Sequence, residues 1–211
     1  MGIKNKQNKI IEYIQNKCHS RNIEILLYPG VSIPYPYPNG SMFVSGFFSP
    51  EEQLLAVAKK GKDSFETLMH EFCHFIQWEE QCKDWTNCSI EEYDAEMLID
   101  LWMRYIIELN KKQLNKYIDL VRNVEMDCEK RVIKFAIDWD YPLDIGKYVQ
   151  KANSYLYFYT VVKKCRKWSN KGCAPYTFNE IVSEMPTHFA NDYNRMSDVL
   201  VSLYKKECLG E

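Results

Sequence analysis

Two histidines and a glutamate share one pentapeptide of this chain. His70, Glu71 and His74 form the pattern His-Glu-x-x-His within residues 67–78. Because four residues make slightly more than one turn of an α-helix, the two imidazoles would project side by side from one helix face. Two nitrogens held in this way suit two corners of a tetrahedral zinc site. The spacing therefore predicts that His70 and His74 bind Zn²⁺.

Glu71 has the position of a general base. It lies about 100° around the helix from His70, close enough to take a proton from water at the metal without being a ligand. Zinc lowers the pKa of such a water from about 15.7 toward 7. Glu71 could then return the proton to the leaving group of a hydrolysed bond. These residues predict metal-assisted hydrolysis.

The third protein ligand has to come from outside the pentapeptide. A catalytic zinc keeps three protein ligands and one open position. The chain has four histidines, and the two outside the motif are His19 and His188. We interpret His188 as an ordinary, partly exposed residue, so we expect an acidic ligand.

Glu125 is the predicted third ligand. It falls inside an apolar stripe of the helix expected around it, and Glu129 lies at the margin of that stripe. The stripe comprises Leu114, Ile118, Val121, Cys128 and Val132. A carboxylate that points into a core is costly unless it is paired or binds a metal. We therefore assign Glu125 to the metal and Glu129 to a zinc-bound histidine as its hydrogen-bond partner, with Glu129 also the first alternative ligand.

Glu96 is the other alternative ligand. It lies 22 positions after the second histidine and four before Asp100. Three nearby acids make a solvated helix start an equally natural interpretation, because acidic side chains favour the N-terminal end of a helix. The burial argument is accordingly weaker for Glu96 than for Glu125.

Hydrolysis of a carbonyl compound also needs a donor for the oxyanion that develops, and a tyrosine hydroxyl can supply one. Tyr155 and Tyr159 share a helix face, whereas Tyr157 points elsewhere. Aromatic packing in the core is the simpler interpretation of these residues. If one of them is catalytic, we predict Tyr155.

The motif segment resembles the active-site helix of gluzincin metallopeptidases, zincins that take a Glu from a later helix as third ligand. The segments HEFCHFIQW, VEMDCEKR and YVQKANSYLYFY are similar to small, mostly uncharacterised metallopeptidase-type proteins of phages, large viruses and microbes. The likeness spans roughly residues 45–195. It implies a zincin-like fold, zinc, and a peptide or protein substrate. The pair Glu96 and Asp100 resembles the Glu-x-x-x-Asp arrangement of thermolysin-like enzymes. The alternative function is a catalytically inactive zincin-fold module that binds metal or another protein.

The elements that would position these residues change in kind near Gly61. Before it we predict a helix over 4–17, strands over 23–28, 42–48 and 53–58, and a turn-rich loop over 29–40 whose prolines remove ladder donors. After it we predict helices, with Asp63 and Glu66 as a capping box. The predicted later segments are a helix over 63–77, a polar connection over 79–89, helices over 90–109, 112–137 and 145–168, a loop over 171–175 and two short helices.

This order predicts the α+β class. We expect a zincin-like fold in one domain, residues 1–211, with an N-terminal helix and small sheet followed by the active-site helix and a mainly helical remainder.

Charge and composition argue against nucleic acid and membranes as partners. The formal net charge is −2, without the basic excess of a nucleic-acid binder. The uncharged stretch 25–50 carries five prolines, which a spanning helix would not, so we expect no membrane partner. The start MGIKNKQNKI lacks the apolar segment of a secretory signal, so we expect a cytoplasmic protein (host cytoplasm for a viral one). The eight cysteines contain no Cys-x-x-Cys pair and are expected to be free thiols.

Overall fold

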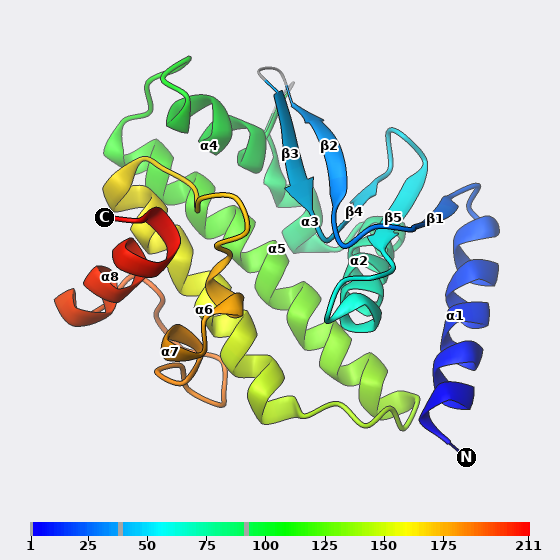
Figure 1. Ribbon diagram of the computed structural model, residues 1–211. Coiled ribbons are helices and arrows are strands. Elements are labelled where there is room, and N and C mark those ends of the chain that lie inside the picture. Colours follow the sequence, from blue (N-terminus) through cyan, green and yellow to red (C-terminus); the bar gives the residue numbers. More distant parts are fainter. Residues whose placement is uncertain (1, 38–39, 91–92) are drawn as a thin grey trace. The chain divides into compact units, whose positions relative to one another are not determined.

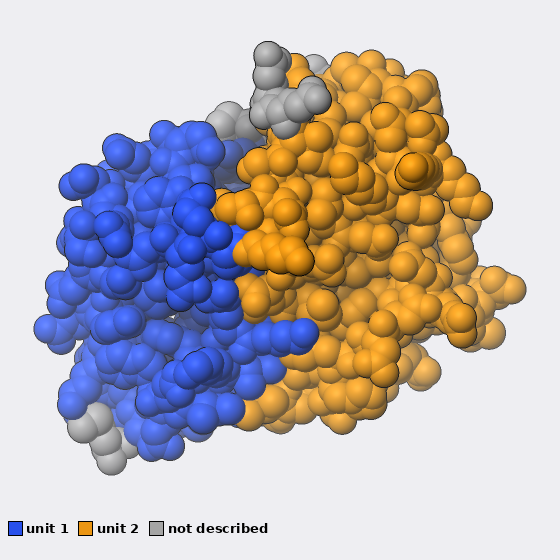
Figure 2. Space-filling view, turned by 180° about the vertical axis from the view of Figure 1, so that it is seen from behind, with its two compact units in different colours: residues 1–82, 128–143 blue, residues 83–127, 144–211 orange. Residues whose placement is uncertain are grey.

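The computed structural model describes residues 2–37, 40–90 and 93–211 (Figure 1). The chain forms two compact units, coloured separately in Figure 2. Unit 1 comprises Met1–Cys82 and Cys128–Leu143, and unit 2 comprises Lys83–Asp127 and Asp144–Glu211. Each unit has its own cluster of buried apolar side chains, and the single domain expected over 1–211 stays a prediction.

Unit 1 contains a three-stranded sheet in the order β1-β5-β4. The central strand β5 (Leu54–Ala58) pairs in parallel with β1 (Glu24–Tyr28) and antiparallel with β4 (Gly46–Ser49). Four of the five β5 residues are buried, as expected of a central strand made of small and branched apolar residues. The predicted strands 23–28 and 53–58 are thereby confirmed.

Two helices bury their apolar faces with this sheet. They are α1 (Ile3–His19) and α2 (Ser64–Glu80), which confirm the predicted helices 4–17 and 63–77. Their shared core, with β1 and β5, includes Ile10, Ile14, Leu55, Phe72 and Phe75. Because α2 packs directly against β4 and β5, the sheet fixes which face of α2 is left for the histidines.

The predicted capping box at the start of α2 is not formed. Asp63 occupies the N-cap position, but its φ of −110° and ψ of 32° are not extended, and its side chain makes no cap hydrogen bond. The backbone carbonyl of Asp63 instead accepts from the backbone N–H of Thr67 at 2.9 Å. The helix start was thus predicted correctly and its capping contact wrongly.

The prediction of a loop over 29–40 is confirmed for residues 29–32 and wrong for residues 33–37 and 40, while residues 38 and 39 lie outside the described residues. Residues Ile33–Tyr37 form β2, which pairs antiparallel with β3 (Gly40–Val44) as a separate two-stranded sheet. Pro34 and Pro36 alternate along β2, so both missing N–H groups belong to one edge of the strand. In a two-stranded sheet that edge can face away from the partner, which is where strands tolerate proline.

The predicted single strand 42–48 is also wrong. It is divided at Ser45 between β3 and β4, which belong to different sheets. The carbonyl of Ser45 accepts from the N–H of Ala58 at 2.8 Å, and from Gly46 onward the chain pairs with β5. The alternation of residue types cannot reveal this break, because both halves are extended.

Unit 2 begins with short elements where a connection over 79–89 and a helix over 90–109 were predicted. The structure has α3 (Lys83–Cys88), the two-residue strands β6 (Ser89–Ile90) and β7 (Tyr93–Asp94), and α4 (Ala95–Met103). Asp94 caps α4 by accepting from the N–H of Met97 at 2.6 Å, and Tyr105, with φ of 59°, lies beyond its C-terminal end. These two local features limit α4 to nine residues.

Two long helices confirm the predictions for 112–137 and 145–168. They are α5 (Lys111–Asp138), whose residues 128–138 belong to unit 1 and 111–127 to unit 2, and α6 (Ile145–Cys165). Helix α6 ends three residues early because Arg166 adopts a left-handed conformation with φ of 53°. The chain closes with short helical segments: a 3₁₀ turn (Pro175–Thr177), α7 (Asn179–Val182), α8 (Asp198–Tyr204) and a π turn (Lys205–Leu209).

The mixed α+β class is therefore confirmed. Among the described helices, none combines the length and the apolar character that crossing a membrane requires. All eight cysteines are free thiols. The stripe predicted on α5 is buried as expected, with Ile118, Cys128 and Val132 fully inaccessible.

Candidate metal centre

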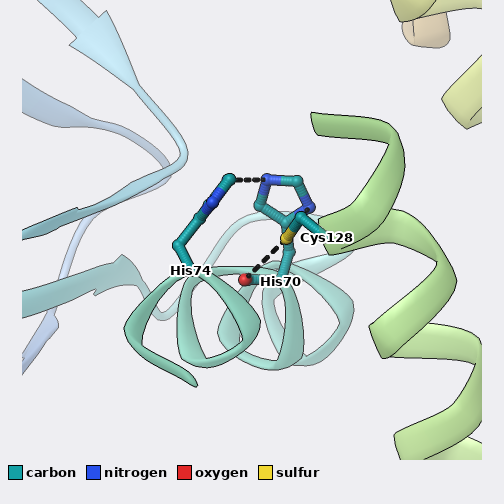
Figure 3. A group of neighbouring side chains, drawn as sticks. All are labelled: His70, His74 and Cys128. Carbon is teal, nitrogen blue, oxygen red and sulfur yellow. Dashed lines mark hydrogen bonds between the residues drawn. The ribbon is translucent and has the colours of Figure 1, made fainter. Parts of the chain in front are cut away.

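The imidazoles of His70 and His74 face each other across one turn of α2. Their Nε2 atoms lie 3.1 Å apart, and the two rings are nearly perpendicular, at 84°. Figure 3 shows both side chains rising from the same side of α2, with the Nε2 contact drawn as a dashed line. The spacing of the motif thus directs the two Nε2 atoms toward each other.

This pair has the dimensions of a zinc chelate. Two nitrogens about 2.0–2.1 Å from a tetrahedral zinc ion lie about 3.3 Å from each other. The observed Nε2 separation of 3.1 Å is close to that value. Both Nδ1 atoms face hydrogen-bonding or charged partners, so both Nε2 atoms are the ones left for a metal. The residues present therefore fit the ion that the motif predicts.

Gln77 faces the Nδ1 atom of His74. Its Oε1 lies 2.8 Å from that nitrogen, and Gln77 is completely buried. An amide oxygen can only accept, so the contact assigns the proton of neutral His74 to Nδ1. The sequence analysis did not single out Gln77. A polar residue three positions after His74, on an otherwise apolar helix face, is the signal that could have identified it.

Glu129 of α5 faces the Nδ1 atom of His70. The Glu129 Oε1 atom lies 3.5 Å from that nitrogen, and Glu129 is only 8% exposed. The structure thus places Glu129 beside a motif histidine, at the nitrogen that points away from the other imidazole.

Cys128 of α5 also lies against His70. Its Sγ is 3.7 Å from His70 Nδ1 and 3.3 Å from the His70 carbonyl oxygen, to which the thiol donates (Figure 3). Among the described residues, ligand atoms of His70, His74 and Cys128 lie within 4.8 Å of one another. The sulfur contacts the His70 ring at Nδ1, whereas the two histidines contact each other through Nε2. Cys128 was predicted only as part of the α5 stripe, and no spacing rule would have placed it here.

The pKa values of the two histidines are shifted in opposite directions. Burial alone would lower the pKa of His70, but Cys128 and the carboxylate of Glu129 raise that pKa well above 6.5. Burial and the charge of His70 lower the pKa of His74 to about 3. The two shifts favour a proton on His70 and none on the neutral ring of His74.

Glu71 is buried on the sheet side of α2, with 8% of its surface exposed. A Cβ atom built on Gly46 would lie 2.9 Å from the Glu71 Cγ, 2.8 Å from the Thr67 Cγ2 and 2.9 Å from the Ala56 carbonyl oxygen. The first residue of β4 therefore touches the predicted general base, and this contact needs glycine. Gly46 was not identified from the sequence, since a lone glycine in an apolar run has several interpretations.

The other predicted site residues belong to unit 2, where Tyr155 and Tyr159 lie together. Their hydroxyl oxygens are 3.2 Å apart. Burial raises the pKa of both hydroxyls well above 10, and the carboxylates of Glu125 and Glu96 raise it further. The structure thus gathers two predicted acids and two tyrosines in one unit. Their roles, Glu125 as third ligand among them, stay predictions.

The ring of Tyr155 packs among other aromatic side chains. Its ring contacts those of Tyr159, Trp168 and Tyr176. His188 uses its backbone carbonyl to accept from the side-chain amide of Asn153 at 2.8 Å.

A comparison of this chain with models of protein families, with curated proteins and with solved structures found no match.

Proposed function

We propose that this chain is a zinc-dependent peptidase in which His70 and His74 hold the metal and Glu71 is the general base. One observation carries the proposal: the two Nε2 atoms lie 3.1 Å apart, while each Nδ1 atom faces a partner of its own. Two histidines four positions apart lie close on any helix, so the separate partner at each Nδ1 atom is what sets this pair apart. The motif lies on α2, directly after strand β5, and this order supports the zincin-like fold that the resemblance implies.

The roles of the residues follow from their positions. Zinc, when bound, would lower the pKa of a water molecule and polarise the scissile carbonyl. His70 and His74 would hold the ion through Nε2. Glu71 follows His70 directly on α2, so its carboxylate can receive the proton of the attacking water and deliver it to the leaving amine. Its partial burial keeps it out of bulk solvent and in place for both transfers.

A peptide is the substrate that the sheet supports. Strand β4 ends the three-stranded sheet, and among the described strands it pairs with β5 alone. An extended peptide can add to such an edge through its main-chain N–H and C=O groups. Because Gly46, at the start of β4, contacts Glu71, a peptide along this edge would pass beside the general base.

The test compares the wild type with Glu71→Gln for both zinc content and proteolysis. Both proteins should carry one zinc by elemental analysis, because Glu71 is not a ligand. Cleavage of fluorescently labelled, denatured casein should fall at least ~10²–10⁴-fold in Glu71→Gln, the usual contribution of a general base. Glu66→Gln, the same change five positions earlier on α2, is the control and should cleave normally.

Wild-type cleavage by Glu71→Gln would reject the mechanism. Stoichiometric zinc without cleavage by the wild type would favour the inactive metal-binding module instead. Zinc content after His74→Ala, Glu125→Gln, Glu129→Gln, Glu96→Gln and Cys128→Ser then identifies the ligands. We expect the first two to lose the ion. Substitution by Co²⁺ should show no thiolate charge-transfer band if Cys128 is not a ligand.

A further inference from the structure

We infer that Gln77 is a positioning residue that holds His74 in the one tautomer able to bind metal. The proposed function supplies the reason why this tautomer matters. The contact between Gln77 and His74 involves protein atoms only, so it can be tested separately from that function.

The geometry of the contact is specific. Gln77 lies three positions after His74 on α2, so the two side chains share a helix face. The amide oxygen of Gln77 is 2.8 Å from His74 Nδ1, within the range of a good hydrogen bond. Gln77 has no exposed surface, so water cannot easily replace it as the acceptor.

The chemistry of imidazole explains the consequence. A neutral ring carries one proton, and the nitrogen that lacks the proton is the one that can bind a metal. With the proton on Nδ1 and donated to Gln77, the lone pair of Nε2 points toward His70. Without an acceptor at Nδ1, a buried N–H would be unsatisfied there, which is costly. The proton would then favour Nε2 and block the coordinating atom.

The two histidines differ in the source of their orientation. The Nδ1 atom of His70 faces Glu129, which is contributed by α5. The Nδ1 atom of His74 faces a residue of its own helix. The partner of His74 is therefore supplied by α2 itself, and a neutral amide orients the ring without adding a buried charge.

The first experiment reads the tautomer directly. Two-bond ¹H–¹⁵N correlations of the histidine rings in the metal-free wild type should show His74 protonated at Nδ1. In Gln77→Met, which keeps the side-chain length and removes the acceptor, His74 should shift to the Nε2-protonated form. In Gln77→Glu an acceptor oxygen is present in either protonation state, so the Nδ1 form should return. A wild-type His74 protonated at Nε2 would overturn the inference without any variant.

The second experiment measures zinc affinity by competition with a chelating indicator. Gln77→Met should bind zinc about 10–100-fold more weakly, the usual effect of removing such a partner, and Gln77→Glu should bind within a few-fold of the wild type. Leu68→Ala, a buried apolar change on the same helix, is the matched control for lost stability. It should leave both the tautomer and the affinity unchanged.

Equal losses of affinity in Gln77→Met and Leu68→Ala would show that Gln77 is merely structural. Unchanged affinity in Gln77→Met would also contradict the inference. If the wild type binds no zinc, the proposed function fails, whereas the tautomer measurement still decides the role of Gln77. If Gln77→Met does not fold, the wild-type and Gln77→Glu spectra decide it.

Discussion

The nitrogens of the two motif imidazoles have different neighbours. These neighbours distinguish the Nε2 side of each ring from its Nδ1 side. Both Nε2 atoms meet at 3.1 Å, while the Nδ1 atoms face Gln77 and Glu129. Partners of this kind orient zinc-bound histidines and increase their basicity. The chemistry of the centre therefore depends on side chains that are not expected to touch the metal.

Removing the carboxylate at Glu129 should weaken metal binding. We expect Glu129→Gln to bind zinc about 10-fold or more weakly, because His70 loses the negative charge beside its Nδ1 atom. Competition with a chelating zinc indicator measures the effect. Asp127→Asn removes a carboxylate two positions earlier on α5 and should change the affinity little. Equal affinities for the wild type and Glu129→Gln would contradict a role of this carboxylate at His70.

Zinc affinity should depend on pH through a single proton. The pKa of His70 is raised above 6.5, so metal must displace its proton, whereas His74, with a pKa of about 3, is already deprotonated. Between about pH 5 and 6.5, log K for zinc should rise by about one per pH unit. Titrations at several pH values measure this slope. A slope near two would mean that both histidines start protonated.

The same pKa shift affects the metal-free fold. A raised folded-state pKa means that protonation of His70 stabilises this fold below the unfolded pKa near 6.5. That contribution is lost as the pH rises through the folded-state pKa of His70.

At the scale of elements, the contact between β4 and α2 positions the general base. Gly46→Ala would place a methyl group within 3 Å of Thr67, Ala56 and Glu71, and the Ala56 atom is a backbone oxygen that cannot easily move. We expect a loss of ~1–3 kcal/mol in the free energy of unfolding, the usual cost of overpacking. Casein cleavage should fall more than zinc affinity does, because Glu71 moves and the histidines stay. Urea titrations, zinc competition and cleavage assays provide the measurements.

Gly146→Ala is the matched control for Gly46→Ala. A Cβ atom at Gly146 would have its nearest neighbour at 3.7 Å, which is ordinary contact. Because Gly146 lies in α6, alanine should leave stability unchanged or raise it by ~0.5–1 kcal/mol. A Gly46→Ala protein as stable and active as Gly146→Ala would remove the argument for a close β4–α2 contact.

At the scale of the whole molecule, bound metal should be linked to folding. Two of the candidate ligands, His70 and His74, lie on α2, which packs against β4 and β5 only when unit 1 is folded. At a free zinc concentration 100 times Kd, the free energy of unfolding should rise by ~2.7 kcal/mol, because the ion binds the folded state. Urea unfolding with zinc and with excess chelator measures the difference. His74→Ala should abolish the zinc effect, and Glu71→Gln should retain it. An unchanged free energy of unfolding of the wild type in zinc would argue against the site.

Features that depend on neighbours within a turn or two of helix could be predicted from the sequence. The i, i+4 spacing of His70 and His74 brings their Nε2 atoms together because helix geometry is local. The same locality explains why α1, α2, α5 and α6 were predicted close to their observed bounds. Their long periodic patterns leave little choice of structure.

The residues that surround the motif could be identified only from the folded chain. The contact of Cys128 with His70 joins positions 58 apart in the chain, and it depends on how α5 packs beside α2. Gly46 reaches Glu71 because β3 and β4 separate at Ser45 into different sheets. Packing between distant segments is set by the shapes of whole faces rather than by local periodicity. The pentapeptide could therefore be identified from the sequence, whereas its contacts with β4 and α5 could not.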